Sequence, residues 1–261
     1  MAEFPKLSDL RARAQPDDVL ARRNAEHWSG RLYLRHLSIY VTRILIPTGI
    51  SANGVTWLMA LVGIAGAAIL GVAQWWALVA CAMLMQLQVL IDCSDGEVAR
   101  WRGTSSAAGI YIDRIGHYLT EGLLPIGFGI YADGGFASIG RYTSVGLATA
   151  VIVLWNKSFG DLVHTSRAAY GLAPLKDDGV KSAPQPKGLR RLRSLLRFAP
   201  FFRSFVAVEF SLIILTVGIV DQVFSFDRAL TRAAALVFVP LAAVIMIGRV
   251  TAILTSERLK S

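Results

Sequence analysis

The apolar positions of this chain fall into six stretches that polar segments separate. A transmembrane helix needs about 20 consecutive, predominantly apolar residues to cross the hydrocarbon core of a bilayer. The six stretches meet this length, and we expect helices at 54–73, 76–99, 105–131, 138–160, 203–221 and 229–252. No internal repeat or low-complexity tract interrupts them. The pattern predicts an all-α integral membrane protein with six transmembrane helices.

The segment before the first stretch has an amphipathic pattern. Within residues 31–46, Arg31, Arg35, Ser38 and Thr42 recur at helical spacing and form one polar stripe, while apolar residues fill the other positions. We expect an N-terminal interfacial helix that lies in the headgroup layer with its arginines toward anionic lipid. The alternative is a short surface helix packed against the bundle.

Composition supports a membrane protein and excludes several other classes. Apolar residues make up 54% of the 261 residues and charged residues 17%, whereas soluble domains have roughly 25% charged residues. This excludes a disordered, collagen-like or disulfide-scaffold chain and makes a soluble enzyme a poor explanation. The two cysteines, Cys81 and Cys93, lie inside apolar runs and say little about the redox compartment. The first 30 residues lack an apolar core, so we expect no cleavable signal peptide.

The formal net charge of +9 would suggest a nucleic-acid partner in a soluble protein, but cytoplasmic loops of membrane proteins collect Lys and Arg. Of the 27 Lys and Arg residues, 21 lie in the segments 1–53, 100–102, 164–203 and 255–261. This bias predicts a multi-pass protein of the cell membrane with both termini in the cytoplasm and no nucleic-acid partner. We therefore expect three parts: a cytoplasmic N-terminus at 1–53, a six-helix membrane domain at 54–254 and a cytoplasmic tail at 255–261.

Four ionisable side chains stand where a membrane helix should be apolar. Asp92 and Asp95 are three residues apart near the cytoplasmic end of the second stretch, and Asp113 and His117 are four apart in the third. Each pair shares a helix face, and the short turn around Gly103 makes the two helices antiparallel neighbours, so the pairs can converge. Ionised carboxylates are costly near hydrocarbon, and three of them also repel one another. Protonation or pairing with arginine would relieve this, but oxygen-rich clusters suit Mg²⁺, Mn²⁺ or Ca²⁺, and we favour a divalent metal.

Small residues flank these acids. Gly96 follows Asp95, while Ala99 and Gly109 each lie about one turn from an aspartate. They leave room either for close helix packing or for a phosphate-bearing ligand. Arg100 does not form a good within-helix pair with either aspartate of its helix. It could instead neutralise a diphosphate or anchor the helix at the interface.

These residues resemble the signature of the CDP-alcohol phosphotransferase (CDP-alcohol phosphatidyltransferase) family, D-x2-D-G-x2-A-R-x8-G-x3-D-x3-D. The matching positions, in this order, are Asp92, Asp95, Gly96, Ala99, Arg100, Gly109 and Asp113. The resemblance implies a membrane transferase of phospholipid or lipid-linked glycan synthesis, in which a hydroxyl acceptor, usually a lipid or a polyol, attacks a CDP-alcohol donor and CMP is released. It also implies membrane lipids as partners, and a homodimer is one expectation because members often form dimers.

The same resemblance implies roles for individual residues. Asp92, Asp95 and Asp113 would bind a divalent metal, Mg²⁺ or Mn²⁺. Gly96, Ala99 and Gly109 would line the CDP site with Arg100, and Asn53 and Thr56 resemble a stretch near the nucleotide.

His117 departs from the signature, which has a fourth aspartate there. In the family that acid is the proposed general base and a candidate metal ligand. A neutral imidazole can remove a proton from an alcohol near neutral pH or bind a metal, where it favours Mn²⁺ or Zn²⁺ over Mg²⁺. The alternative is a degenerate family member that has lost catalysis.

Further polar side chains lie within the apolar stretches, among them Glu121, Lys157 and Arg249. They could bind an anionic acceptor, or form interhelix hydrogen bonds or snorkel toward the interface. A second alternative for the whole protein is a cation transporter or channel whose intramembrane acids move the ion.

Overall fold

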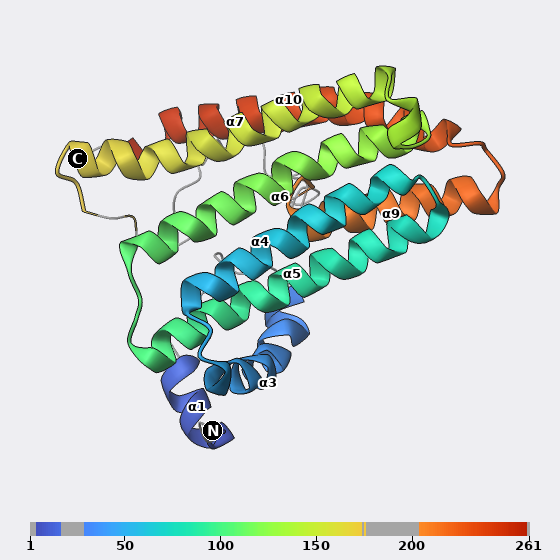
Figure 1. Ribbon diagram of the computed structural model, residues 1–261. Coiled ribbons are helices and arrows are strands. Elements are labelled where there is room, and N and C mark those ends of the chain that lie inside the picture. The colour runs from blue at the N-terminus through green and yellow to red at the C-terminus, as the bar shows by residue number, and fades with distance from the viewer. Residues whose placement is uncertain (1–3, 17–28, 174, 176–203, 260–261) are drawn as a thin grey trace. The chain divides into compact units, whose positions relative to one another are not determined.

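The structure is a computed structural model and describes residues 4–16, 29–173, 175 and 204–259 (Figure 1). Its described residues form helices and contain no strand. The α-helices are α1 (Leu7–Ala14), α3 (Arg35–Leu45), α4 (Ala52–Ala68), α5 (Trp75–Arg102), α6 (Ala107–Asp133), α7 (Arg141–Ala169), α9 (Ala207–Val223) and α10 (Ala229–Thr255). Short π or 3₁₀ turns are η1 (Gly30–Leu34), η2 (Ile46–Thr48), η3 (Ile69–Val72), η4 (Phe136–Ser138) and η7 (Glu257–Leu259).

Three of the described helices are long and apolar enough to cross a membrane: Ala52–Val72, Trp75–Arg102 and Ala229–Thr255. The all-helical class is therefore confirmed, together with these three candidate spans. The helices α6 and α7 are of similar length, but each carries charged side chains along its course. The helix α9 has 17 residues. The helix α7 continues to Ala169, beyond the expected end at 160, and residues 176–203 of the expected basic segment lie outside the described residues.

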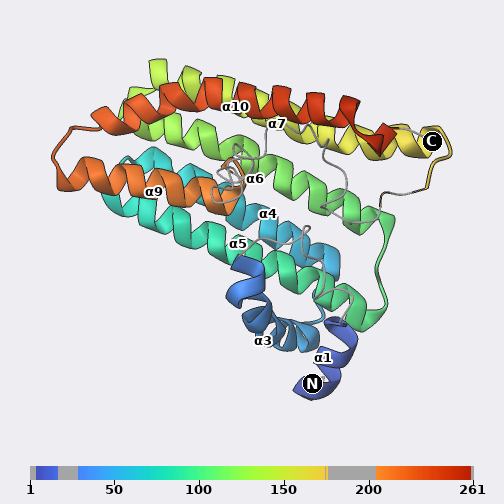
Figure 2. The ribbon, with the colours of Figure 1, turned by 180° about the vertical axis from the view of Figure 1, so that it is seen from behind.

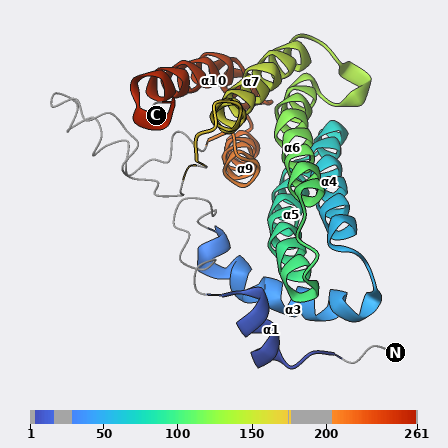
Figure 3. The same ribbon diagram turned by 90° about the vertical axis from the view of Figure 1, so that its left-hand side faces the viewer.

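The chain divides into two compact units. Unit 1 comprises the described residues of Met1–Gly66 and Cys81–Thr120, which are α1, α3, most of α4 and α5, and the first half of α6. In this unit the three long helices lie side by side, and α1 and α3 lie against the last turns of α5 (Figure 3). Its helices approach closely at Gly63, where an added Cβ would stand 2.0 Å from the Thr120 hydroxyl oxygen.

The helix α3 has the predicted amphipathic pattern, but its polar stripe faces the protein. Ser38 and Thr42 are fully buried against α5, whereas Leu37, Tyr40 and Ile44 are exposed. The expectation that the arginines of this stripe turn toward lipid was wrong for Arg35, whose Nη1 lies 3.9 Å from Glu97 Oε1. The side chain of Arg31 lies outside the described residues. The physical reason is the buried carboxylate of Glu97, which requires hydrogen-bond donors around it.

Unit 2 comprises the described residues of Ala67–Ala80 and Glu121–Ser261. In this unit α7 and α10 run alongside each other (Figure 2). A cluster of phenylalanines, with ring centroids 5.0–6.2 Å apart, packs between α6, α9 and α10.

Two aspartates of unit 2 accept hydrogen bonds from the first turns of the helices α7 and α10. The Asp133 carboxylate accepts hydrogen bonds from the amides of Gly140, Tyr142 and Thr143 and from the Thr143 hydroxyl, at 2.7–3.1 Å. Asp221 accepts equivalent bonds from the first turn of α10, at Leu230 and Thr231. Such bonds satisfy amides that have no partner within the helix. Burial alone would raise the pKa of Asp133, but these hydrogen bonds to the carboxylate outweigh it and lower the pKa.

Candidate metal and nucleotide site

The signature acids of α5 and α6 meet in unit 1. His117 Nε2 lies 3.3 Å from Asp92 Oδ1 on the neighbouring helix and 3.4 Å from Asp113 Oδ1, one turn earlier on its own helix. One potential ligand atom from each of these residues lies within 4.8 Å of the other two. Their side chains are 21–39% exposed, so the cluster is open to a small entering ion. The imidazole therefore stands between the two aspartates rather than apart from them.

Asp95 adds a third carboxylate beside this cluster. Its Oδ2 is buried and has no hydrogen-bond partner in the part of the chain that the structure describes. Asp92 and Asp113 lie near enough to repel its charge. A buried carboxylate oxygen without a donor is costly, and a cation is the group that would offset both the missing hydrogen bond and the repulsion.

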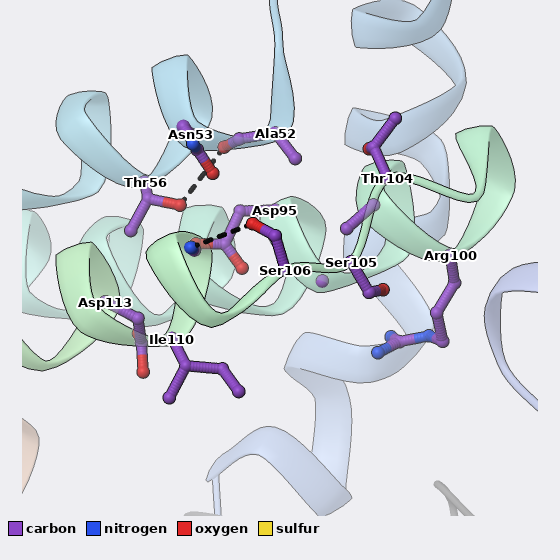
Figure 4. Close-up of a pocket in the computed structure, with 13 residues that line it drawn as sticks. Ala52, Asn53, Thr56, Asp95, Arg100, Thr104, Ser105, Ser106, Ile110 and Asp113 are labelled. Carbon is purple, nitrogen blue, oxygen red and sulfur yellow. Dashed lines mark hydrogen bonds between the residues drawn. The ribbon is translucent and has the colours of Figure 1, made fainter.

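A cavity of about 200 Å³ opens beside these acids, between the start of α4, the end of α5 and the start of α6. In Figure 4, Asn53, Thr56 and Asp113 lie toward one end of it, Asp95 lies near the middle and Arg100 lies at the opposite end. Its lining consists of Ala52, Asn53, Thr56, Asp95, Gly96, Ala99, Arg100, Thr104, Ser105, Ser106, Gly109, Ile110 and Asp113. The cavity is therefore both hydroxyl-rich and charged, as a site for a phosphorylated ligand requires.

An added Cβ at either glycine of the cavity would be a tight fit. A Cβ at Gly109 would lie 3.3 Å from Asn53 Oδ1 across the cavity, and one at Gly96 would lie 3.1 Å from Arg100 Nη1. Backbone on two sides can thus approach a ligand closely. The guanidinium of Arg100 lies beside Gly96, with its Nε donating to the carbonyl of Ala14 at 2.6 Å.

The structure brings together the residues that the sequence analysis singled out for a metal and a nucleotide. The six residues predicted at the nucleotide all line the cavity, namely Asn53, Thr56, Gly96, Ala99, Arg100 and Gly109. Asp113 belongs both to the cavity and to the cluster with Asp92 and His117. Sequence reasoning missed the hydroxyls of Thr104, Ser105 and Ser106. The only signal for them was a polar turn of small residues between two helices.

Glu121, Lys157 and Arg249 lie in a separate cluster in unit 2. Lys157 Nζ lies 2.9 Å from Glu121 Oε1, and Arg249 Nη1 donates to the carbonyl of Asn156 at 3.3 Å. These four residues line a smaller cavity of about 120 Å³. Glu121 is therefore paired with a lysine of α7 within its own unit.

Comparisons with known proteins give a family match and a similar fold. The family model of CDP-alcohol phosphatidyltransferases matches residues 49–169. None of the curated protein sequences matches the chain. The fold is similar to crystal structures of phosphatidylinositol phosphate synthase from Mycobacterium tuberculosis. The structure of that enzyme with CDP-DAG bound matches with a TM-score of 0.55 at 18% sequence identity. The match covers 87% of this chain and 98% of the mycobacterial chain.

Two further structures of the same enzyme match similarly. The complex with manganese and citrate has a TM-score of 0.54 at 18% identity and covers 86% of this chain and 92% of that one. The apo form has a TM-score of 0.52 at 20% identity, and the match covers 85% of this chain and 98% of the mycobacterial chain. At these identities the solved structures support the fold alone, whereas the family model matches the segment that contains the signature residues. Residues 49–169, which carry the site, thus match the family model of CDP-alcohol phosphatidyltransferases.

Proposed function

We propose that this protein is a membrane-embedded transferase that moves a substituted phosphate from a CDP-alcohol to a hydroxyl acceptor and releases CMP. One observation carries the proposal. The acids of two neighbouring helices, with ligand atoms within 4.8 Å, border a cavity lined by the family's small residues and an arginine. The substrates would come from phospholipid or lipid-linked glycan synthesis, with a lipid on at least one side of the reaction.

The donor set fits a divalent cation. Asp92, Asp113 and His117 offer two carboxylate oxygens and one imidazole nitrogen, and Asp95 adds a buried oxygen that lacks a hydrogen-bond donor among the described residues. Such a mixed set suits Mn²⁺ and is compatible with Mg²⁺. A structure of the similar mycobacterial enzyme contains manganese. A divalent ion here would neutralise the diphosphate and help to align the attacking and leaving oxygens.

The chain's own residues would hold the donor and move one proton. Arg100 would pair with the diphosphate, and Gly96 and Gly109 would let the nucleotide approach the backbone. The acceptor oxygen then attacks the phosphorus that bears the donor alcohol, and a new P–O bond forms. The P–O bond to CMP breaks, and CMP leaves with the bridging oxygen. His117 would take the acceptor's proton on its imidazole, or would serve as a further ligand of the cation.

We also propose the membrane arrangement. Six spans would place both termini and the site in the cytoplasm, where the donors are made. The supporting observation is the concentration of Lys and Arg in the segments 1–53, 100–102, 164–203 and 255–261. Reporter fusions after residue 261 and within the turn at 134–140 should give opposite sides of the membrane. Reporters on the same side would contradict the three spans that we expect between these two points. A homodimer is expected from the family, and light scattering of the purified protein would test it.

The activity is tested by CMP release from the full-length protein in detergent. CDP-diacylglycerol and CDP-glycerol would serve as donors, with Mn²⁺ or Mg²⁺ and a panel of lipid and polyol acceptors. We expect release that requires the metal and is abolished by Asp113→Ala, because that change removes an acid shared by the cluster and the cavity. Asp9→Ala, an exposed acid on α1, is the matched control and should keep full activity. Binding of the donors without turnover would identify a degenerate member, and an active Asp113→Ala enzyme would refute the site.

A further inference from the structure

The buried carboxylate of Glu97 has no part in the chemistry described so far. It occupies a variable position of the signature, between Gly96 and Arg100, and is fully buried. Because successive residues of an α-helix are about 100° apart, Glu97 lies on the side of α5 opposite Asp95 and Ala99. An acid buried on the far side of a catalytic helix requires an explanation, since burying an unpaired carboxylate is strongly unfavourable.

The explanation lies in the N-terminal helices. Glu97 Oε1 accepts hydrogen bonds from Gln15 Nε2 at 2.8 Å and Ser38 Oγ at 2.5 Å, and Oε2 accepts one from Thr42 Oγ1 at 2.7 Å. Gln15 also donates to the carbonyl of Arg35 at 2.8 Å. Hydrogen bonds to an ionised acceptor are stronger than neutral ones. One carboxylate thereby ties α1 and α3 to α5.

The tether reaches α1 at its C-terminal end, where the carbonyl of Ala14 meets the signature arginine. Gln15 directly follows α1, and the preceding residue, Ala14, accepts the hydrogen bond from Arg100 Nε at 2.6 Å. The last carbonyls of a helix lack intrahelical partners and carry the negative end of its dipole. Leu10 and Ala14 of α1 also pack with Ile39 and Trp101. The end of α1 is therefore held next to Arg100 by the hydrogen bond from Gln15 to Glu97 and by apolar packing against Ile39 and Trp101.

Arg100 needs such support because of its place on the helix. By helical periodicity it lies between the face of Glu97 and the face of Gly96, and a long flexible side chain there could turn toward either. With Nε held by Ala14, the rest of its guanidinium lies beside Gly96 and lines the cavity. We propose that Gln15 and Glu97 are positioning residues, which hold α1 so that Arg100 points at the diphosphate of the donor. This inference rests on the proposed function, in particular on the contact between Arg100 and the diphosphate.

The test compares binding of CDP and CMP to the full-length protein in detergent with Mn²⁺, by titration calorimetry. Gln15→Met keeps the length of the side chain but removes its donor. We expect it to weaken CDP binding about fivefold and CMP binding less than twofold, because CMP lacks the second phosphate that Arg100 would contact. Gln15→Ala should have the same effect. A purely structural role would weaken both nucleotides together.

Two controls separate the tether from general destabilisation. Thr42→Val removes an equally short hydrogen bond to the same carboxylate, but from α3, so it should lower the melting temperature without changing the ratio of CDP to CMP affinity. Ser8→Ala, on the exposed side of α1, should change neither quantity. A selective loss of CDP affinity in either control would refute a role specific to α1.

A double-mutant cycle shows whether Gln15 acts through Arg100. Arg100→Ala should weaken CDP binding about tenfold, and adding Gln15→Met to it should have no further effect. A further loss in the double variant would refute the positioning role. If Arg100→Ala weakens CDP binding and Gln15→Met does not, the positioning role alone is refuted. If Arg100→Ala leaves CDP binding unchanged, the proposed diphosphate contact and the positioning role both fail.

Discussion

His117→Asp is the most informative change at the candidate metal site, because it restores the family's signature and adds a charge at a known place. In the structure, His117 Nε2 stands 3.3 Å from Asp92 Oδ1 and 3.4 Å from Asp113 Oδ1. An imidazole there can donate a hydrogen bond to an acid. A carboxylate in its place can only repel both acids until a cation binds.

The size of the effect follows from the geometry. At 4.8 Å, the bound on separations within the cluster, two unit charges repel by about 3 kcal/mol in an effective dielectric of 20. Solvent screens this value, since the side chains of Asp92 and Asp113 are 24% and 39% exposed. We therefore expect the metal-free variant to be less stable than the parent by about 1–3 kcal/mol. Binding of Mn²⁺ should remove that repulsion, so the variant should gain more stability from the ion than the parent does.

Thermal unfolding in EDTA and across a Mn²⁺ titration measures both effects, and CMP release reports whether catalysis survives. His117→Ala is the control, because it removes the imidazole without adding charge and should show no increased response to the ion. The reasoning is refuted if His117→Asp matches the parent in EDTA and in its response to Mn²⁺. A variant that binds Mn²⁺ more tightly but releases no CMP would show that the imidazole has a chemical task that a carboxylate cannot perform.

Three further changes test the cavity and the packing that forms it. Gly109→Val should weaken CDP binding at least tenfold with little loss of stability, because even a Cβ would stand 3.3 Å from Asn53 Oδ1. Ala108→Val, at the exposed neighbouring position, is the matched control. Equal losses of CDP affinity in the two variants would contradict an effect of the cavity. Gly63→Ala should cost about 1–3 kcal/mol of stability, because its Cβ would meet the Thr120 side chain at 2.0–3.0 Å. Adding Thr120→Ala should recover part of that stability in thermal unfolding, and no recovery would contradict this contact. Asp133→Asn should lower stability by about 1 kcal/mol at neutral pH. Since folding lowers the pKa of Asp133, its contribution is present above the unfolded pKa of about 3.9 and is lost as the pH falls through the folded value. The gap between parent and variant in thermal unfolding should therefore close in acid, and a gap that persists there would refute the linkage.

The sequence by itself determined the features that depend on spacing along one helix or on a short connection between two. Asp113 and His117 had to share a face because they are four residues apart, and the short turn at Gly103 had to return α6 alongside α5. These two constraints were sufficient to predict that the two pairs of ionisable residues can converge. The family signature added the chemistry, because it specifies the same residues at the same spacing.

Only the tertiary structure decided which neighbour covers each helix face. The periodicity of residues 31–46 predicted a polar stripe, yet Ser38 and Thr42 turn inward to the buried Glu97, and apolar residues of the same helix face outward. Gln15 meets Glu97 across 82 residues of sequence, and no local pattern encodes a contact at that separation. Helical periodicity predicts that one face of a helix is polar and the opposite face apolar. Which segment packs against each face depends on how parts of the chain that are distant in sequence fold together. For that reason the acids of the site were predictable, and the helix that holds Arg100 in place was not.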